Sequence, residues 1–207
     1  CYRCVRVCPV KAISVSDGQA YIEDELCIKC GTCVRECPQG AKTIRSSIER
    51  AKELLGSGRK VAVSLAPSFA AAFNPKDCYK LSYALRKLGF SYVSETAEGA
   101  KLITEESFKN TTDGNICTAC PAVVEYIEKY KPEYIDVMIP VVSPMVAHGR
   151  LLKKRRGKDW AVVFIGPCAA KKQEAQRPEN RDAIDCVLTF TELIEWMEEE
   201  NILLDEC

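Results

Sequence analysis

The 207-residue sequence lacks any apolar run close to the roughly 18 residues that a membrane-spanning helix needs. It also lacks an excess of either charge, because 29 Lys and Arg residues balance 29 Asp and Glu residues. A chain without a net field has nothing to attract nucleic acid or an anionic membrane surface. We therefore expect no nucleic-acid partner and no membrane partner.

The cysteines do not suit a disulfide-bonded protein, and no secretion signal is visible. Thirteen cysteines occur, seven of them within the first 37 residues. An odd number of cysteines in closely spaced motifs is a poor disulfide framework and a good set of metal ligands. Thiolate ligands need a reducing compartment, so we predict a cytoplasmic protein.

The segment CIKCGTCVRECP, from Cys27 to Pro38, has the C-x2-C-x2-C-x3-C-P spacing of bacterial-type ferredoxins. Three thiolates at this spacing can bind three corners of one 4Fe-4S cube from a single loop. The fourth cysteine binds the other cluster in two-cluster ferredoxins. Zinc is the alternative, but zinc sites use two well-separated cysteine pairs. The segment therefore predicts a 4Fe-4S cluster.

The first 45 residues contain this motif twice, offset by 29 residues. Crossed ligation of the two copies gives two ligand sets, Cys8, Cys27, Cys30 and Cys33 for one cluster and Cys1, Cys4 and Cys37 for the other. The counterpart of Cys27 in the first copy is missing, and we expect it before Cys1. Residues 1–45 are thus predicted to form an α+β, ferredoxin-like two-cluster domain. We expect a hairpin at 13–15 and 20–22 and a short helix after each Cys-Pro.

Residues 46–207 alternate between helical and strand patterns. Helices are expected at 46–55, 79–88, 97–108, 122–130 and 144–154, and from Thr189 or Thr191 to 200; strands are expected at 60–65, 91–93, 160–165 and 183–188. This alternation predicts a second, α/β domain with a mainly parallel sheet. Ligands bind at the carboxyl ends of such strands, where Ala66-Pro67-Ser68 and Gly166-Pro167-Cys168 lie.

The second region contains two further cysteine motifs. They are Cys117-Thr118-Ala119-Cys120-Pro121 and Ile165-Gly166-Pro167-Cys168-Ala169-Ala170-Lys171-Lys172. Both resemble the first two signature motifs of the iron-only (FeFe) hydrogenases. Ala66-Pro67-Ser68, Ser143-Pro144 and the segment 185–189 occur in the order that the family has. The resemblance covers the ferredoxin region and the first part of the catalytic domain.

The resemblance implies an H-cluster in the full-length protein, in which a 4Fe-4S cube is joined to a two-iron subsite carrying CO and cyanide. By motif position, Cys120 and Cys168 would bind the cube. Lys171 would donate to one cyanide, and Pro67 and Ser68 would contact the other. A buried anionic cofactor needs charge-assisted donors of this kind.

The departures from the family pattern are informative. Ala119 stands where active members have a cysteine that passes protons. His148, the only histidine, is a conceivable substitute, but on a helix we expect an ordinary exposed or capped side chain. Glu105 and Glu106 resemble the acidic pair of the family's proton path, with a solvated helix face as the alternative. The third cysteine motif is absent, and Cys78 and Cys186 are interpreted as structural.

Three functions follow as hypotheses. The first is a slow or sensory FeFe-hydrogenase-like protein of a divergent type, with ferredoxin as electron partner, hydrogen and protons as substrates and a downstream signalling domain. The second is an electron-transfer or iron–sulfur-assembly protein on the same fold without hydrogen chemistry. The third is a ferredoxin domain joined to a silent interaction domain, so that changing Cys120 or Cys168 would leave the iron content unaltered.

Overall fold

The ferredoxin-like region is built around a small hairpin in the computed structural model, which describes residues 1–112 and 114–204. Strands β1 (Ile13–Ser16) and β2 (Gln19–Ile22) pair antiparallel, with Ser16 opposite Gln19. Both turn residues have positive φ, 51° at Asp17 and 73° at Gly18, as a two-residue hairpin turn requires. The predicted hairpin is confirmed.

The short helices of this region lie before each Cys-Pro and not after it, so that prediction is wrong. Helix α1 (Arg3–Val7) ends at Cys8, and α2 (Thr32–Arg35) ends shortly before Cys37. A residue that precedes proline is disfavoured in the α region, so each Cys-Pro ends a helix. Cys8 accordingly has an extended backbone.

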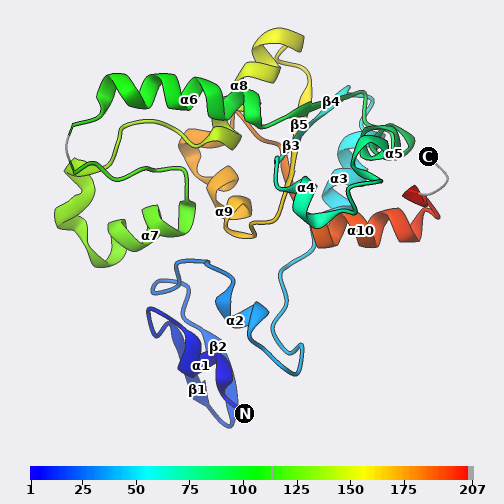
Figure 1. The fold of residues 1–207 in the computed structure, drawn as a ribbon. Coiled ribbons are helices and arrows are strands. Elements are labelled where there is room, and N and C mark those ends of the chain that lie inside the picture. The colour runs from blue at the N-terminus through cyan, green and yellow to red at the C-terminus, as the bar shows by residue number, and fades with distance from the viewer. Residues whose placement is uncertain (113, 205–207) are drawn as a thin grey trace.

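The second region holds most of the helices and a four-stranded sheet (Figure 1). Its elements before residue 113 are α3 (Ile48–Gly56), β3 (Val61–Leu65), α4 (Phe69–Ala72), η1 (Cys78–Lys80), α5 (Leu81–Lys87), β4 (Tyr92–Glu95) and α6 (Ala97–Asn110). Those after it are α7 (Pro121–Tyr130), η2 (Pro132–Val137), α8 (Pro144–Arg156), β5 (Ala161–Gly166), α9 (Ala170–Gln176), η3 (Pro178–Asn180), β6 (Cys186–Thr189) and α10 (Phe190–Glu199).

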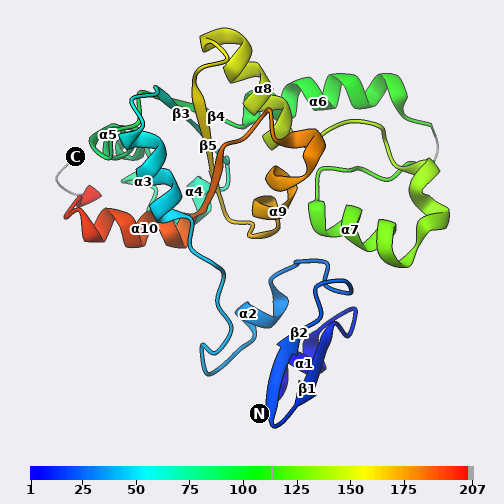
Figure 2. The same cartoon turned by 180° about the vertical axis from the view of Figure 1, so that it is seen from behind.

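The sheet has the order β4-β3-β5-β6, and every pairing in it is parallel. Strands β3 and β5 are buried along their whole length, which explains their near-continuous apolar sequences. Helices lie around the sheet in both views (Figures 1 and 2). The predicted α/β class with a mainly parallel sheet is confirmed.

Two loops that carry candidate site residues leave the sheet side by side. Leu65 at the end of β3 is opposite Ile165 in β5, and the Ala66 amide donates to the Ile165 carbonyl at 2.8 Å. The segments 66–68 and 166–168 therefore share the carboxyl edge of the sheet, where ligands bind in this class of fold.

Two helices begin at capping residues. Thr189 rather than Thr191 caps α10, in a capping box with Glu192, and the Ser143 hydroxyl accepts from the Val146 amide with Pro144 at the first position of α8. Strand β6 begins at Cys186, later than predicted. Helix α9 was not predicted, although AKKQEAQ consists of good helix formers.

Among residues 1–112 and 114–204, no helix is both long and apolar enough to cross a bilayer.

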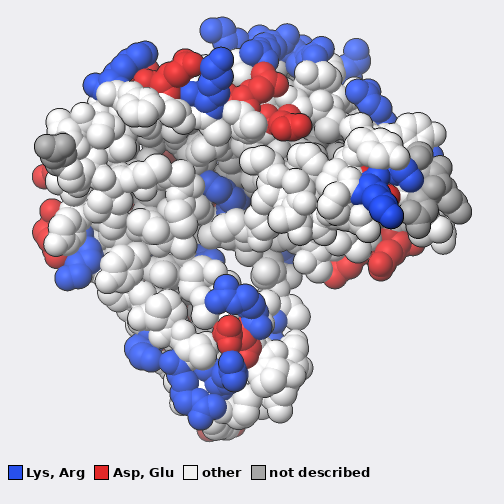
Figure 3. All heavy atoms as spheres, in the orientation of Figure 1, with Lys and Arg blue, Asp and Glu red and all other residues white. Residues whose placement is uncertain are grey.

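Lys and Arg side chains gather along the top of the molecule in Figure 3, and the last turn of α8 contributes Lys153, Lys154, Arg155 and Arg156. Figure 3 also shows a hollow between the lower, ferredoxin-like lobe and the domain above it.

Candidate iron–sulfur sites

Four cysteines from both halves of the repeat line one small pocket. They are Cys8, Cys27, Cys30 and Cys33, and no other cysteine lines it. Apolar side chains, among them Ile13 and Ile28, complete its wall. This grouping is the crossed ligand set expected from the spacing, and its donors suit a 4Fe-4S cube.

The four thiols that share this pocket also influence one another electrostatically. Burial, followed by the neighbouring thiols of Cys27 and Cys30 and also that of Cys8, raises the pKa of Cys33. Cysteine binds iron as the thiolate, so iron binding must displace the thiol protons, and the positive charge of the iron would favour that ionisation. Backbone amides already point at its sulfurs, from Ala12 to Cys8 and from Lys29 to Cys27, each at 3.3 Å.

Within the described residues, no group of three or more Cys, His, Asp or Glu side chains could hold a single metal ion. Zinc at about 2.3 Å from each sulfur would require such convergence, whereas a four-iron cube holds its cysteine sulfurs farther apart. None of the described cysteines forms a disulfide. These thiols are therefore free to act as ligands.

The sulfur of Cys37, assigned to the second cluster, is surrounded by backbone donors. Amides of Gln39, Ala41, Lys42 and Gly40 lower the pKa of Cys37, as suits a thiolate ligand. Of its predicted co-ligands, Cys4 is buried and Cys1 is exposed. An ion pair between Arg3 and Glu36, at 2.7 Å, joins the helix of Cys4 to the residue before Cys37.

Cys120 stands directly before a helix, and Cys168 stands two residues before one. Cys120 is the N-cap residue of α7, with Pro121 in the first position, and Cys168 lies between β5 and α9. Cys120 is exposed and Cys168 half-buried. No third metal-binding side chain of the described residues joins them, so the part of the chain that the structure describes supplies only two thiols for this site.

Lys171 links the two cysteine loops. Its Nζ donates to the Ala119 carbonyl at 3.0 Å and lies 2.7 Å from Glu174 Oε2. Both side chains of this ion pair are largely buried, with 12% and 9% of their surfaces exposed. The Glu174 oxygen has no hydrogen-bond partner, so the close approach to Lys171 is a charge contact without hydrogen-bond geometry. Lys171, a residue of the second motif, thus bonds the backbone of the first.

The other residues predicted at the subsite, Pro67 and Ser68, are exposed at the edge of the sheet. They lie on the loop next to that of Cys168, as the strand pairing requires. A separate cavity of about 390 Å³ includes Thr118, Pro121, Glu174 and Arg177 in its lining. It therefore borders the helix that Cys120 caps.

The expectation of an exposed His148 is wrong, because its side chain is fully buried. Nδ1 lies 2.7 Å from Ser64 Oγ and Nε2 lies 3.1 Å from Ser94 Oγ. The Ser94 hydroxyl also donates to Glu98 at 2.7 Å, and Glu98 pairs with Arg155. Burial lowers the pKa of His148, so the ring is neutral at pH 7. The sequence signal that could have revealed this network is the serine at an inward position of two buried strands.

The remaining candidates have ordinary surroundings. Glu105 and Glu106 are exposed on α6, and Glu106 pairs with Lys109 at 3.0 Å, which is the solvated-face alternative. Burial raises the pKa of the Cys186 thiol to about 11, which fits a structural role, and Cys78 is half-buried. Cys207 lies outside the described residues.

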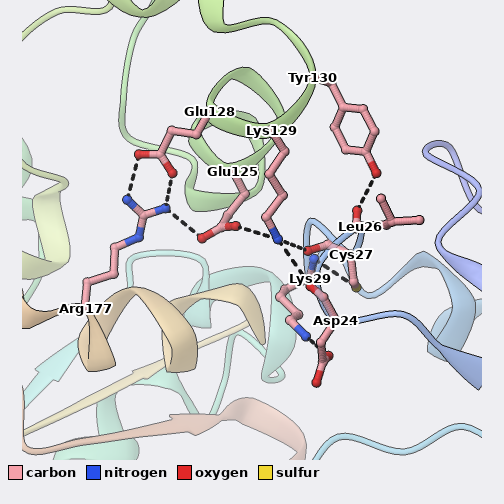
Figure 4. A network of polar contacts seen from close by, with 9 residues as sticks. All are labelled: Asp24, Leu26, Cys27, Lys29, Glu125, Glu128, Lys129, Tyr130 and Arg177. Atoms are coloured by element: carbon pink, nitrogen blue, oxygen red, sulfur yellow. Dashed lines mark hydrogen bonds and ion pairs between the residues drawn. The ribbon is translucent and has the colours of Figure 1, made fainter.

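A cleft lies between the ferredoxin-like cysteine loop and the loop of Cys168. Cys27, Cys33 and Lys29 line one side of it, and Ala169, next to Cys168, lines the other together with Lys172. Polar contacts bridge the two regions nearby, between the end of α7 and the segment 24–27 (Figure 4). The cysteine-rich loop therefore faces the region of Cys168.

Comparison with known families gives two matches, one for each region of the chain. Residues 59–207 match the family described as "Iron only hydrogenase large subunit, C-terminal domain", and residues 1–41 match the "4Fe-4S dicluster domain". The second match supports 4Fe-4S clusters in the ferredoxin-like region.

Curated relatives belong to two functional groups. The NADP-reducing hydrogenase subunit HndD of Solidesulfovibrio fructosivorans is 30% identical over 87% of this chain and 37% of its own length. The cytosolic Fe-S cluster assembly factor NAR1 of Yarrowia lipolytica is 31% identical over 85% of this chain and 43% of its own. The cytosolic iron-sulfur assembly component 3 of Mus musculus is 29% identical over 87% and 46%. The chain thus spans less than half the length of these relatives.

Proposed function

Because this chain belongs to the iron-only hydrogenase large-subunit family, we propose that it is an iron–sulfur electron-transfer protein that serves cluster assembly and performs no hydrogen chemistry. In this proposal the ferredoxin-like region holds two 4Fe-4S clusters. Cys120 and Cys168 are two ligands of a further cluster in the full-length protein. Relatives named as assembly factors, at about 30% identity, support this choice.

The observation that carries the proposal is the position of Lys171. In the hydrogenase interpretation this lysine is needed to donate to a cyanide ligand. Here its ammonium is used by the Ala119 carbonyl and the Glu174 carboxylate, which gives it a role in holding the Cys120 loop against the Cys168 loop. A lysine with that role needs no two-iron subsite to account for it.

The ligand assignment can be tested by iron content. Full-length protein is reconstituted anaerobically with iron and sulfide, with Cys120→Ser and Cys168→Ser as variants and Cys78→Ser as a matched control. We expect each of the two variants, but not the control, to lose about four irons and one cluster signal in electron paramagnetic resonance (EPR) spectra. Unchanged iron content in both variants would support the silent interaction domain instead.

A second candidate is the slow or sensory hydrogenase with a complete H-cluster. It is favoured by the similarity to the hydrogenase subunit and by the position of Pro67 and Ser68 beside the Cys168 loop. Infrared spectra of the protein after maturation distinguish the two candidates. Our proposal expects no CO or cyanide bands and no hydrogen evolution, and the appearance of those bands would favour the second candidate.

Location and partners follow the same proposal. The thiol-rich ligand sets need a reducing compartment, and relatives are named as cytosolic proteins, so we place the protein in the cytosol. A ferredoxin-like electron donor or acceptor is the expected partner. A downstream signalling domain, with hydrogen and protons as substrates, belongs only to the second candidate. Nucleic acid and membrane have no place in either.

A further inference from the structure

Helix α7 connects Cys120 with the pocket lined by Cys8, Cys27, Cys30 and Cys33. It begins directly after Cys120 and ends at Tyr130. At that end the Tyr130 hydroxyl donates to the Leu26 carbonyl at 2.7 Å, and Lys129 Nζ donates to the Cys27 carbonyl at 2.9 Å (Figure 4). One ten-residue helix therefore reaches from one candidate ligand loop to the other.

The ammonium group of Lys129 is held by three acceptors. Besides the Cys27 carbonyl they are the Asp24 carbonyl at 3.3 Å and Glu125 Oε2 at 3.1 Å. A lysine ammonium has three N–H donors, so each has a partner. The positive charge is thus fixed against the backbone of a residue whose sulfur lines the cluster pocket.

An ion-pair ladder supports this lysine from behind. Arg177, at the end of α9, bonds both carboxylate oxygens of Glu128, at 2.9 and 2.7 Å, and Glu125 at 2.7 Å. Burial opposes ionisation of Glu125, but hydrogen bonds from Arg177 and Lys129 lower its pKa. The ladder keeps Lys129 in place, because its carboxylate partner is itself fixed by Arg177.

We propose that Lys129 is a positioning residue that fixes the Cys27 loop against α7 and makes the 4Fe-4S cluster of Cys8, Cys27, Cys30 and Cys33 easier to reduce. A reduced cluster carries one more negative charge, and a fixed cation beside it stabilises that charge. Reduction potentials of such clusters respond to nearby charge and hydrogen bonding. The orientation of this cluster toward Cys120 rests on the proposed function; its potential does not.

The chain offers a matched control two residues further on. Lys131 follows α7 directly, has the same charge and is 48% exposed, and its ion pair is with Glu133 at 3.5 Å. It lies near the same helix end, and its side chain makes no hydrogen bond or ion pair with the segment 24–27. A difference between Lys129→Met and Lys131→Met therefore reports the contact with the Cys27 loop rather than loss of a positive charge.

The test is an EPR-monitored redox titration of the full-length protein with reconstituted clusters. The signal of the relevant cluster is identified as the one lost in Cys30→Ser. We expect Lys129→Met to shift its midpoint to lower potential, and Lys131→Met to leave it unchanged. Lys129→Arg, which keeps the charge, should keep most of the wild-type potential and serves if the Met variant fails to fold. Equal midpoints for Lys129→Met and Lys131→Met would overturn the proposal.

Two further measurements separate this proposal from the proposed function. The first is made in a Cys120→Ser/Cys168→Ser background. There the shift in midpoint potential caused by Lys129→Met should persist, even if Cys120 and Cys168 bind no cluster. Tyr130→Phe removes the bond to Leu26 without changing charge, so it should speed amide exchange in 24–27 and leave the midpoint close to wild type. A Tyr130→Phe shift as large as that of Lys129→Met would contradict a role for the charge.

Discussion

Replacing Lys171 by methionine is the sharpest test of how the two cysteine loops are held. The substitution removes the donor to the Ala119 carbonyl and leaves Glu174, 9% exposed, without its counter-charge. Removing one partner of a buried ion pair costs about 3–5 kcal/mol, because the remaining charge is left uncompensated. A typical domain is stable by about 5–15 kcal/mol, so the loss would be a large fraction of the total.

The assay is denaturant unfolding of cluster-free protein, followed by circular dichroism, with a double-mutant cycle. We expect Lys171→Met to lower the free energy of unfolding by about 3–5 kcal/mol. Lys171→Met/Glu174→Gln leaves no buried charge, so it should lie within about 2 kcal/mol of wild type. A single mutant that costs less than about 1 kcal/mol, or a double mutant no better than the single, would refute the reasoning.

Three other predictions concern the helix pair α6–α8 and the Ala119 loop. A Cβ at Gly99 would lie 2.3 Å from the Pro144 carbonyl oxygen and 2.7 Å from His148 Cβ, so Gly99→Ala should destabilise by about 1–3 kcal/mol in urea unfolding; an unchanged midpoint would contradict that packing. Because burial lowers the pKa of His148 from its ordinary value of 6.5, the unfolded chain binds the proton more readily. Unfolding free energy should therefore fall as pH drops below 6.5, and His148→Gln should remove this dependence; a wild-type slope in that variant would count against it. Ala119→Cys should leave stability unchanged, since Lys171 holds the carbonyl, and should produce no hydrogen evolution in the full-length protein; measurable evolution would favour the second candidate function.

Local sequence signals sufficed where the structure is local. The cysteines of one ligand loop lie within seven residues, from Cys27 to Cys33, so their spacing alone predicts that they meet. The buried strands β3 and β5 are recognisable from continuous apolar runs. The threonines before an amphipathic pattern indicate a helix start at Thr189 or Thr191, and the structure decides for Thr189. These features depend on neighbouring residues and not on the rest of the fold.

Contacts between distant segments could not be predicted in the same way. Lys171 meets Ala119 across 52 residues, and Lys129 meets Cys27 across 102. Burial of His148 is compensated by two serines from separate strands that bond its ring nitrogens, and nothing on its own helix indicates those partners. Basic residues in an exposed-looking pair, such as Lys171 and Lys172, have the same sequence signal whether or not they pair with buried carboxylates.

Two sets of contacts fix the distance between the loops of Cys120 and Cys168. At the start of α9, Lys171 bonds the carbonyl of the residue before Cys120. At its end, Arg177 bonds Glu125 and Glu128 of α7. Two helices joined at both ends cannot slide or rotate independently, so the loops of Cys120 and Cys168 keep one separation.

The contacts that join α7 and α9 continue into the ferredoxin-like region. Lys129 links the Arg177 ladder to the Cys27 carbonyl, while Lys172 on α9 donates to the Arg45 carbonyl at 2.8 Å and to Glu192 at 2.6 Å. Helix α7, which follows Cys120, and helix α9, which lies just after Cys168, thus both contact the ferredoxin-like region. Ala119 takes part in this arrangement only through its backbone carbonyl, which accepts from Lys171, so the contact between the two loops requires no particular side chain at position 119.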